Sequence, residues 1–363
     1  MDDREVEDLT AIVPLLLAAL EALGFIGRYL IPTELDAVLA AVGEPEAPLR
    51  AAVEGMSEWP DALAQVRANL TTACEQTIGA FEALREAHAA GDDMGQVYRA
   101  LRGAPRAQAA LYPFAAGLAP VSRFFLEPGK RGDADLQARL AEAPARDDTG
   151  VIHAGGEPGS RGGFSLYVPE YYTPDRTWPL VVALHGGAGS GRSFLWTWLR
   201  DARSHGAILV TPTAVGDTWA LMGPDADTPN QARIVEAVRS RWTVDPTRLL
   251  LTGMSDGGTF AYVSGLEAAS PFTHLAPISA AFHPMLVEMA DPGRLRGLPI
   301  HVAHGALDWM FPVDLAREAN ALLSAAGADL VYREIEDLSH TYPRELNAEI
   351  LSWMAATAAQ AST

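Results

Sequence analysis

Apolar residues recur at helical spacing through the first third of the chain. Leu9, Ile12, Leu16 and Leu20 lie three or four positions apart, and residues 61–89 carry the longest such stripe. Shorter stripes follow the same spacing at Leu35–Val42, Met94–Leu101 and Ala107–Leu118. The pattern predicts an α-helical bundle of four to six helices, in which these apolar residues form the core.

The pattern changes after the turn-rich segment Pro128–Asp133. We place a domain boundary near residue 145, which gives an α-helical accessory domain, 1–145, and a second domain, 146–363. In the second domain short apolar runs alternate with helical patterns. The expected strands are Phe164–Val168, Leu180–Leu184, Ile208–Val210, Leu249–Leu251, Leu275–Ser279, Pro299–Ala303 and Leu330–Ile335. The expected helices include Asn230–Trp242, Val313–Ala325 and Pro343–Ala356. Such alternation predicts an α/β domain with a mostly parallel sheet covered by helices on both faces.

The expected strand Leu249–Leu251 leads into the sequence Gly253-Met254-Ser255-Asp256-Gly257, and a helical segment follows. Strand, tight turn and helix are the context in which Gly-x-Ser-x-Gly carries a nucleophile. Glycines suit such a turn because a Cβ at either position would collide with the neighbouring backbone. We therefore predict Ser255 as a nucleophile, and the Asp256 N–H as a donor to an oxyanion.

A second glycine-rich turn, His185–Gly189, follows the expected strand Leu180–Leu184. Functional groups in parallel sheets gather at the carboxyl ends of the strands, so this turn is expected beside Ser255. We predict the Gly187 N–H as the second oxyanion donor and His185 as a brace for the loop. An ordinary glycine turn without a role is the alternative.

A serine nucleophile also needs a base and an orienting acid. Asp308 follows the expected strand Pro299–Ala303, and His340 follows the strand Leu330–Ile335. Taken singly, the two residues could be a capping aspartate and an isolated loop histidine. Together with Ser255 they occur in the chain order Ser, Asp, His, which is the order of the α/β-hydrolase triad.

Residues from about 150 to 360 resemble the α/β-hydrolase superfamily. They look most like its phospholipase/carboxylesterase group and the related polyhydroxybutyrate-depolymerase and feruloyl-esterase-like enzymes. The motifs that carry the resemblance are Leu184–Gly187, Gly253–Gly258, His304-Gly305-x-x-Asp308-x-x-Phe311-Pro312 and Ser339-His340. The resemblance implies a cofactor-free serine hydrolase of small carboxylic esters or thioesters. It implies Ser255 as nucleophile, His340 as base and Asp308 as orienting acid, and it does not extend to the helical domain.

Several large side chains fall in or beside the predicted loops and are candidates for the substrate pocket. They are Trp196, Trp219, Met254, His283, Trp309, Phe311 and Tyr342. Such side chains favour an apolar or aromatic acyl group; packing between the domains is the alternative. No metal is expected, because Asp225 and Asp227 lack a third ligand at metal spacing.

The formal net charge of −19 over 363 residues argues against nucleic acid or an anionic membrane surface as a partner. A single cysteine, Cys74, excludes an intramolecular disulfide and a cysteine-based metal cluster. The acidic N-terminus is unlike a signal peptide, and the ten-residue apolar run Ala11–Leu20 is too short to span a bilayer. The expectation is a cytoplasmic protein without a membrane span.

Two other classes of function remain open at this point. One is a binding or scaffolding protein on a hydrolase fold that has lost its activity, and such proteins usually lack a triad member. The other is different chemistry on the same fold, such as a peptidase or an acyltransferase.

The helical domain is expected to pack on the hydrolase domain, or on a second copy of itself in a homodimer, because several of its helices are apolar on more than one side. A position near the carboxyl ends of the strands would make it a lid. Deletion of residues 1–145 is then expected to abolish discrimination between acyl chain lengths or to cause aggregation. Assays of the truncated protein on esters of graded length test this, and a soluble enzyme of unchanged specificity would show that the domain is not a lid.

Overall fold

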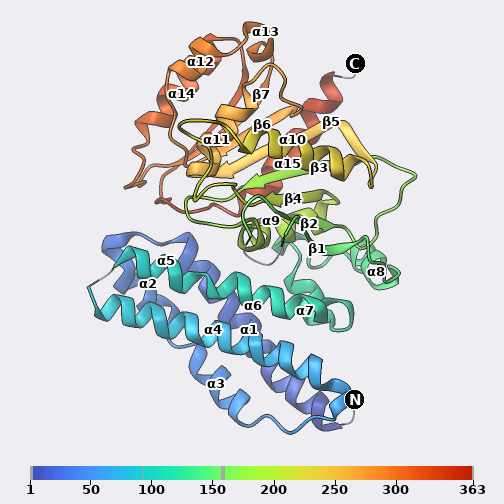
Figure 1. Cartoon of the computed structure of the whole chain (residues 1–363). Helices are drawn as coiled ribbons and strands as arrows, with labels where there is room; N and C mark the ends of the chain where they lie inside the picture. The colour runs from blue at the N-terminus through green and yellow to red at the C-terminus, as the bar shows by residue number, and fades with distance from the viewer. Residues whose placement is uncertain (1–2, 92, 157–159, 362–363) are drawn as a thin grey trace. The chain divides into compact units, whose positions relative to one another are not determined.

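The computed structural model describes residues 3–91, 93–156 and 160–361 and divides into two compact units, Met1–Asp133 and Ala134–Thr363 (Figure 1). The first unit is helical. Its two long helices are α1 (Asp3–Arg28) and α4 (Ala64–Ala89). The shorter ones are α2 (Leu35–Val42), α3 (Glu46–Glu54), α5 (Met94–Leu101), α6 (Gly103–Leu111) and α7 (Ala119–Phe124). Single 3₁₀ turns lie at Pro32–Glu34, Asp61–Leu63, Tyr112–Ala116 and Pro128–Lys130.

The described part of this unit thus holds seven α-helices, where the sequence predicted four to six. The expected helix Ala107–Leu118 is interrupted at Tyr112–Ala116 because Pro113 cannot donate the backbone hydrogen bond of a helix interior. Helix α3 was not predicted. Its prolines suggest a turn, but Pro48 lies in the first turn of the helix, where no N–H is needed.

Helix α1 is longer than the apolar run that we expected to be too short for a membrane. It continues through Pro14 to Arg28, and among the described helices it alone has the length and composition of a membrane span, with a mean hydropathy of 2.2 in its most apolar 18-residue window. Within that window 44% is buried inside the protein. Ile12, Leu16 and Ile26 are fully buried, as is typical of a core helix.

The second unit is built on a sheet of eight strands in the order β1-β2-β4-β3-β5-β6-β7-β8. Strand β2 is antiparallel to both β1 and β4, and every pair from β4 to β8 is parallel. The strands are β1 (Gly150–Ala154), β2 (Phe164–Val168), β3 (Trp178–Leu184), β4 (Ile208–Pro212), β5 (Val244–Met254), β6 (His274–Ile278), β7 (Pro299–Gly305) and β8 (Asp329–Ile335). The carboxyl ends of the parallel strands therefore meet at one edge of the sheet.

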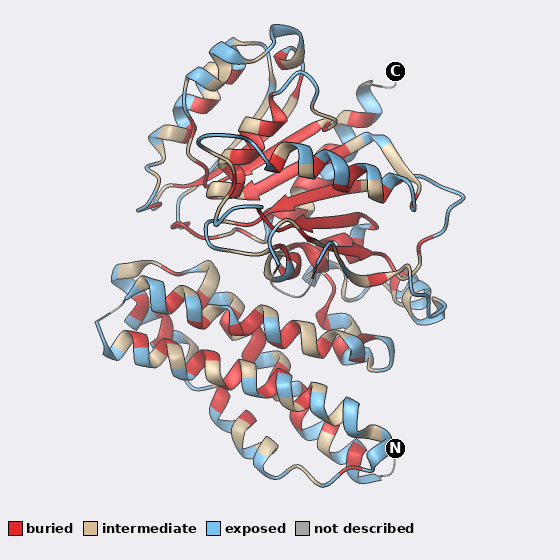
Figure 2. Ribbon diagram, in the orientation of Figure 1, coloured by how far each residue is buried: buried red, intermediate tan, exposed pale blue. Residues whose placement is uncertain are grey.

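Helices cover both faces of this sheet (Figure 1). Helices α9 (Gly191–His205) and α15 (Leu346–Ala361) lie on one face. Helices α10 (Asp227–Arg239), α11 (Asp256–Gly265) and α14 (Asp314–Ala325) lie on the other face, where their apolar side chains form one core with Leu180, Val182 and Leu184 of β3. Two short helices, α12 (Met285–Met289) and α13 (Pro292–Leu295), follow β6. The central strands are buried, while the edge strands β1 and β8 are largely half-buried or exposed and the outer sides of the helices are exposed (Figure 2). The predicted α/β-hydrolase fold, preceded by an α-helical region, is confirmed.

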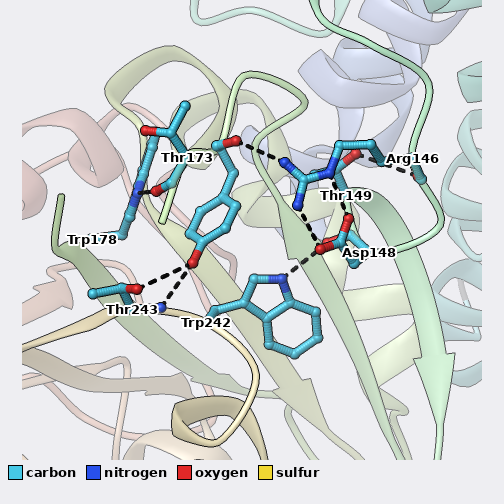
Figure 3. Close-up of polar contacts among 8 residues, drawn as sticks. Arg146, Asp148, Thr149, Thr173, Trp178, Trp242 and Thr243 are labelled. Atoms are coloured by element: carbon cyan, nitrogen blue, oxygen red, sulfur yellow. Dashed lines mark hydrogen bonds and ion pairs between the residues drawn. The ribbon is translucent and has the colours of Figure 1, made fainter. Parts of the chain in front are cut away.

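The segment before β1 belongs to the second unit, so the division lies after Asp133 rather than near residue 145. Helix α8 (Ala134–Glu142) places the Arg139 guanidinium 4.7 Å from the centre of the Tyr171 ring. Beyond it, Arg146 binds both carboxylate oxygens of Asp148 and the Tyr172 carbonyl (Figure 3). These polar contacts attach residues 134–149 to the second unit.

Candidate active site

Strand β5 ends in a strained turn at Ser255. This residue has φ 56° and ψ −123°, a left-handed region that a residue with a side chain rarely adopts. Its N–H donates to the Ile278 carbonyl of β6 at 3.0 Å, and α11 begins at the next residue. A Cβ on Gly257 would lie 2.5 Å from the Leu184 carbonyl oxygen, so only glycine allows α11 to approach β3 this closely. The predicted strand, turn and helix are thus present.

Ser255, His340 and Asp308, which are 85 and 32 residues apart along the chain, meet at the carboxyl edge of the sheet. His340 Nε2 lies 3.0 Å from Ser255 Oγ, and His340 Nδ1 lies 2.8 Å from Asp308 Oδ2. All three residues are buried. The contacts let Nδ1 donate to the carboxylate while Nε2 accepts from the serine hydroxyl. This is the geometry that a serine nucleophile requires.

The Asp308 carboxylate is held in its ionised form. Burial by itself raises the pKa of this carboxyl, but hydrogen bonds from His304, from His340 and from the Phe311 N–H outweigh it and hold the pKa well below its usual range. Oδ1 accepts from the N–H groups of Met310 at 2.9 Å and Phe311 at 2.8 Å. The turn after β7 therefore presents a fixed negative charge to His340.

The glycine-rich loop after β3 is clamped by His185, as predicted. Its Nε2 accepts from the Ala214 N–H at 3.1 Å, so its hydrogen is on Nδ1, which donates to the Gly186 carbonyl at 2.7 Å. The same carbonyl accepts from Gly189 N–H at 3.1 Å. Because a trans peptide places its C=O and N–H on opposite sides, fixing the Gly186 carbonyl also fixes the Gly187 N–H on the other side. The role of this N–H as an oxyanion donor stays a prediction.

Asp256, the residue after Ser255, connects three loops. Its N–H opens α11 and has no acceptor within that helix. Its Oδ2 accepts from Thr218 Oγ1 at 2.5 Å, and a Cβ on Gly187 would lie 2.8 Å from the same oxygen. The carboxylate thus holds the loop after β4 against the turn, and it requires glycine at position 187.

Two more residues brace the glycine-rich loop, and the sequence analysis assigned neither of them this role. Arg161 donates to the carbonyls of Gly189, at 3.1 Å, and Asp217. The Trp219 indole N–H donates to the His185 carbonyl at 2.7 Å, and its ring stacks on Phe260. The sequence does not show such hydrogen bonds, because the acceptors are backbone carbonyls of residues that are distant along the chain.

The predicted pocket residues divide into buried and accessible groups. Trp196, on α9, and Trp219, which braces the loop, are buried, and their role as pocket residues stays a prediction. Tyr342 is half-buried and donates to Asn347 Oδ1 at 2.8 Å, which anchors the segment after His340. The accessible ones are Met254 and Phe311, both half-buried, and His283 and Trp309, both exposed. Phe311 lies edge-to-face on the His340 ring, with centroids 5.2 Å apart.

Within residues 3–91, 93–156 and 160–361, no group of three or more His, Cys, Asp or Glu residues is arranged to hold a metal ion. Asp225 and Asp227 instead organise the loop after β4. Asp225 Oδ1 accepts from the N–H groups of Asp227 and Thr228, and the Asp227 carboxylate accepts from Val215 and Ala220.

Two buried histidines are expected to make the second unit sensitive to acid. Burial lowers the pKa of His185 and of His274 to about 4 from the ordinary 6.5. Between these values the unfolded chain binds protons that the folded chain does not, so stability is complete above pH 6.5 and falls as the pH drops to 4. Each histidine accounts for roughly 3 kcal/mol of this loss.

Urea unfolding at pH 7 and pH 4 measures the loss. His274→Gln is the matched variant, since glutamine keeps an N–H for Thr357 Oγ1, which lies 2.6 Å from His274 Nε2, but does not titrate. It is expected to remove the share of one histidine, roughly 3 kcal/mol, from the loss of stability between the two pH values. Equal stability of the wild type at both pH values would contradict the prediction.

No family model matches the chain. The chain is 27% identical over 158 residues to a probable feruloyl esterase C from Aspergillus terreus, a match that covers 42% of this chain and 56% of that protein. It is 29% identical over 129 residues to a bifunctional acetylxylan esterase/xylanase from Neocallimastix patriciarum, covering 34% of this chain and 18% of that protein. The chain thus spans about half the length of the first relative and less of the second.

Among solved structures, a ferulic acid esterase is similar with a TM-score of 0.49 and 17% identity, over 58% of this chain and all of that one. A thermostable esterase gives a TM-score of 0.48 and 22% identity, over 58% of this chain and 63% of that one. The predicted resemblance to esterases is confirmed by the two curated relatives. That the relatives are named esterases agrees with the prediction of a carboxylic-ester hydrolase.

Proposed function

We propose that this protein hydrolyses carboxylic esters through an acyl-enzyme on Ser255. The observation that carries the proposal is the pair of contacts at His340, 3.0 Å to Ser255 Oγ and 2.8 Å to Asp308 Oδ2. A serine hydroxyl is a weak nucleophile unless a base removes its proton as it attacks. Here a buried base and its orienting acid lie at hydrogen-bond distance in the required order.

The reaction follows from these positions. Ser255 Oγ attacks the ester carbonyl while its proton passes to His340 Nε2, and Asp308 stabilises the resulting imidazolium. The negative charge that develops on the carbonyl oxygen is stabilised by the N–H groups of Asp256 and Gly187. His340 returns the proton to the departing alcohol, which leaves an acyl ester on Ser255. A water molecule, deprotonated by His340, then releases the acid and restores the serine.

The accessible side chains support an ester with an apolar or aromatic part. Leu307, Trp309 and Met310, next to Asp308, have 47%, 46% and 41% of their surface exposed. Exposed apolar side chains gathered beside a reactive centre are typical of a surface that binds apolar groups. The relatives named feruloyl esterase and acetylxylan esterase support aromatic and short acyl esters as the first substrates to examine.

A panel of p-nitrophenyl acetate, butyrate, octanoate and ferulate, assayed beside a peptide panel, tests the proposal. Hydrolysis of the esters without cleavage of the peptides is expected. Cleavage of peptides alone would indicate a peptidase, and transfer of the acyl group to an added alcohol in preference to water would indicate an acyltransferase. A protein that hydrolyses no ester and does not react with a serine-directed phosphonate would be a binding protein on this fold.

A further inference from the structure

A second histidine contacts the Asp308 carboxylate. His304 lies near the end of β7, has 1% of its surface exposed, and places Nε2 2.8 Å from the Phe311 carbonyl oxygen and 3.3 Å from Asp308 Oδ2. Both neighbours of Nε2 are acceptors, so the hydrogen of the imidazole is on this nitrogen and is shared between them. His304 is therefore a donor to the same carboxylate oxygen that accepts from His340 Nδ1 at 2.8 Å.

The four contacts use the full capacity of the carboxylate. Oδ1 accepts two backbone N–H groups, from Met310 and Phe311, and Oδ2 accepts the two imidazoles. A carboxylate has about four lone-pair sites, so no site is left for rotation to a different set of partners. Without His304, Oδ2 would be held by His340 alone, and the Phe311 carbonyl would lose its imidazole donor.

We infer that His304 is a positioning residue that shares the Asp308 carboxylate with His340. It fixes the plane of the carboxylate, and it withdraws part of the negative charge that would otherwise stabilise protonated His340. This inference rests on the proposed function of the Ser255 site, because only there does the orientation of His340 affect a rate.

The charged and titratable groups around His304 come from the turn after β7, from β8, from the segment after β8 and from α14. Asp308 lies in the turn after β7, and His340 lies in the segment after β8. Glu334 of β8 pairs with His304 in the register of the sheet. Its carboxylate is bound by Arg317, at 2.6 Å, and by the Tyr332 hydroxyl, at 2.8 Å. The charge of Glu334 is thus balanced by Arg317, whereas Asp308 presents its negative charge to His304.

Loss of the His304 donor has two expected effects on catalysis. Asp308 gains rotational freedom, so kcat falls by about 10- to 100-fold, the size expected for a lost hydrogen bond to a charged group, while KM changes little. Relieved of one donor, the carboxylate also holds the His340 imidazolium more tightly. The acid limb of the kcat/KM profile therefore moves to higher pH.

The test compares His304→Leu, which has no donor, with His304→Gln, whose amide N–H can reach the position of Nε2. The leucine variant is expected to show the lower kcat and the shifted acid limb, and the glutamine variant to recover most of both. His304→Met serves if the leucine variant does not fold, because its flexible side chain adapts to an irregular cavity. An unchanged kcat and an unchanged pH profile of kcat/KM in the folded leucine or methionine variant would overturn the inference. It would also be overturned if that variant and the glutamine variant lost the same share of kcat and neither showed a shifted acid limb.

A titration of ¹³C-labelled histidines by NMR separates this inference from the proposed function. The His340 midpoint is expected to move upward in the leucine variant whether or not the protein turns over esters. If the wild type hydrolyses no ester but the His340 midpoint still moves upward in the leucine variant, the result contradicts the proposed function and supports the contact with His304. Turnover in the wild type with no shift of the midpoint would contradict the inference alone.

Discussion

Replacement of Ser255 by alanine is expected to lower kcat/KM for p-nitrophenyl esters by about 10⁵-fold or more, the size of the effect when the nucleophile of such a triad is removed. The hydroxyl oxygen forms the acyl bond, and no other group of the site can replace it. Substrate binding should persist, because the loops that contact the ester are unchanged. Initial rates, together with mass spectrometry of the protein after treatment with a serine-directed phosphonate, measure the outcome.

Ser279 supplies a matched control. It follows β6, the strand beside β5, it is fully buried, and it also has a positive φ, of 45°. Its Oγ has no hydrogen-bond partner among the residues that the structure describes, so Ser279→Ala should cost little stability. The Ser279 variant is expected to keep its activity and its labelling at Ser255. Activity that survives in the Ser255 variant, or that disappears equally in both, would refute Ser255 as the nucleophile.

The strands that precede the candidate triad residues could be predicted because each strand contains a short apolar run. Leu249–Leu251 fixed the centre of β5, although the strand itself runs from Val244 to Met254. Among the additional residues, Thr252, Gly253 and Met254 pair with neighbouring strands through their backbone, which leaves no periodic trace in the sequence. Glycines and a serine at fixed spacing then specified the turn, since close approach of backbones excludes other residues there.

The direction of a side chain could not be predicted in the same way. Trp219 lies in a loop beside the site, as expected, but its ring faces inward, where the indole N–H finds the His185 carbonyl. A loop has no periodicity that distinguishes its inner from its outer side. The sequence therefore does not distinguish a loop residue that lines a pocket from one that packs in the core. Trp196 is similar: it falls on a helix, α9, whose inner face is defined only by the sheet that it covers.

The contact of His304 with Asp308 was missed for a related reason. The spacing His-Gly-x-x-Asp is part of a motif, but the two residues between the end of β7 and Asp308 belong to an irregular turn. Whether a side chain at the end of a strand reaches back to such a turn depends on its dihedral angles. The signal available in the sequence was the presence of a second histidine within four residues of the expected acid.

Replacement of Asp308 by asparagine is expected to lower kcat/KM by about 10⁴-fold with KM nearly unchanged, as for the orienting acid of other serine triads. Asparagine is isosteric with aspartate, but it has one acceptor atom and one donor group. If its oxygen accepts the N–H groups of Met310 and Phe311, its NH₂ group faces both imidazoles. The NH₂ group then repels the His304 N–H and favours the His340 tautomer with the hydrogen on Nε2. That tautomer donates to Ser255 and cannot accept its proton.

The opposite orientation of the amide leaves the N–H groups of Met310 and Phe311 facing another donor, so neither orientation satisfies the turn. Rates with p-nitrophenyl butyrate across pH, with a thermal melt to confirm folding, measure the effect. His304→Leu in the Asp308→Asn background is expected to restore no activity, because the amide NH₂ group, relieved of the conflict with the His304 N–H, still favours the His340 tautomer with the hydrogen on Nε2. A loss smaller than about 10-fold in a folded Asp308→Asn protein would show that His340 is oriented by something other than this carboxylate.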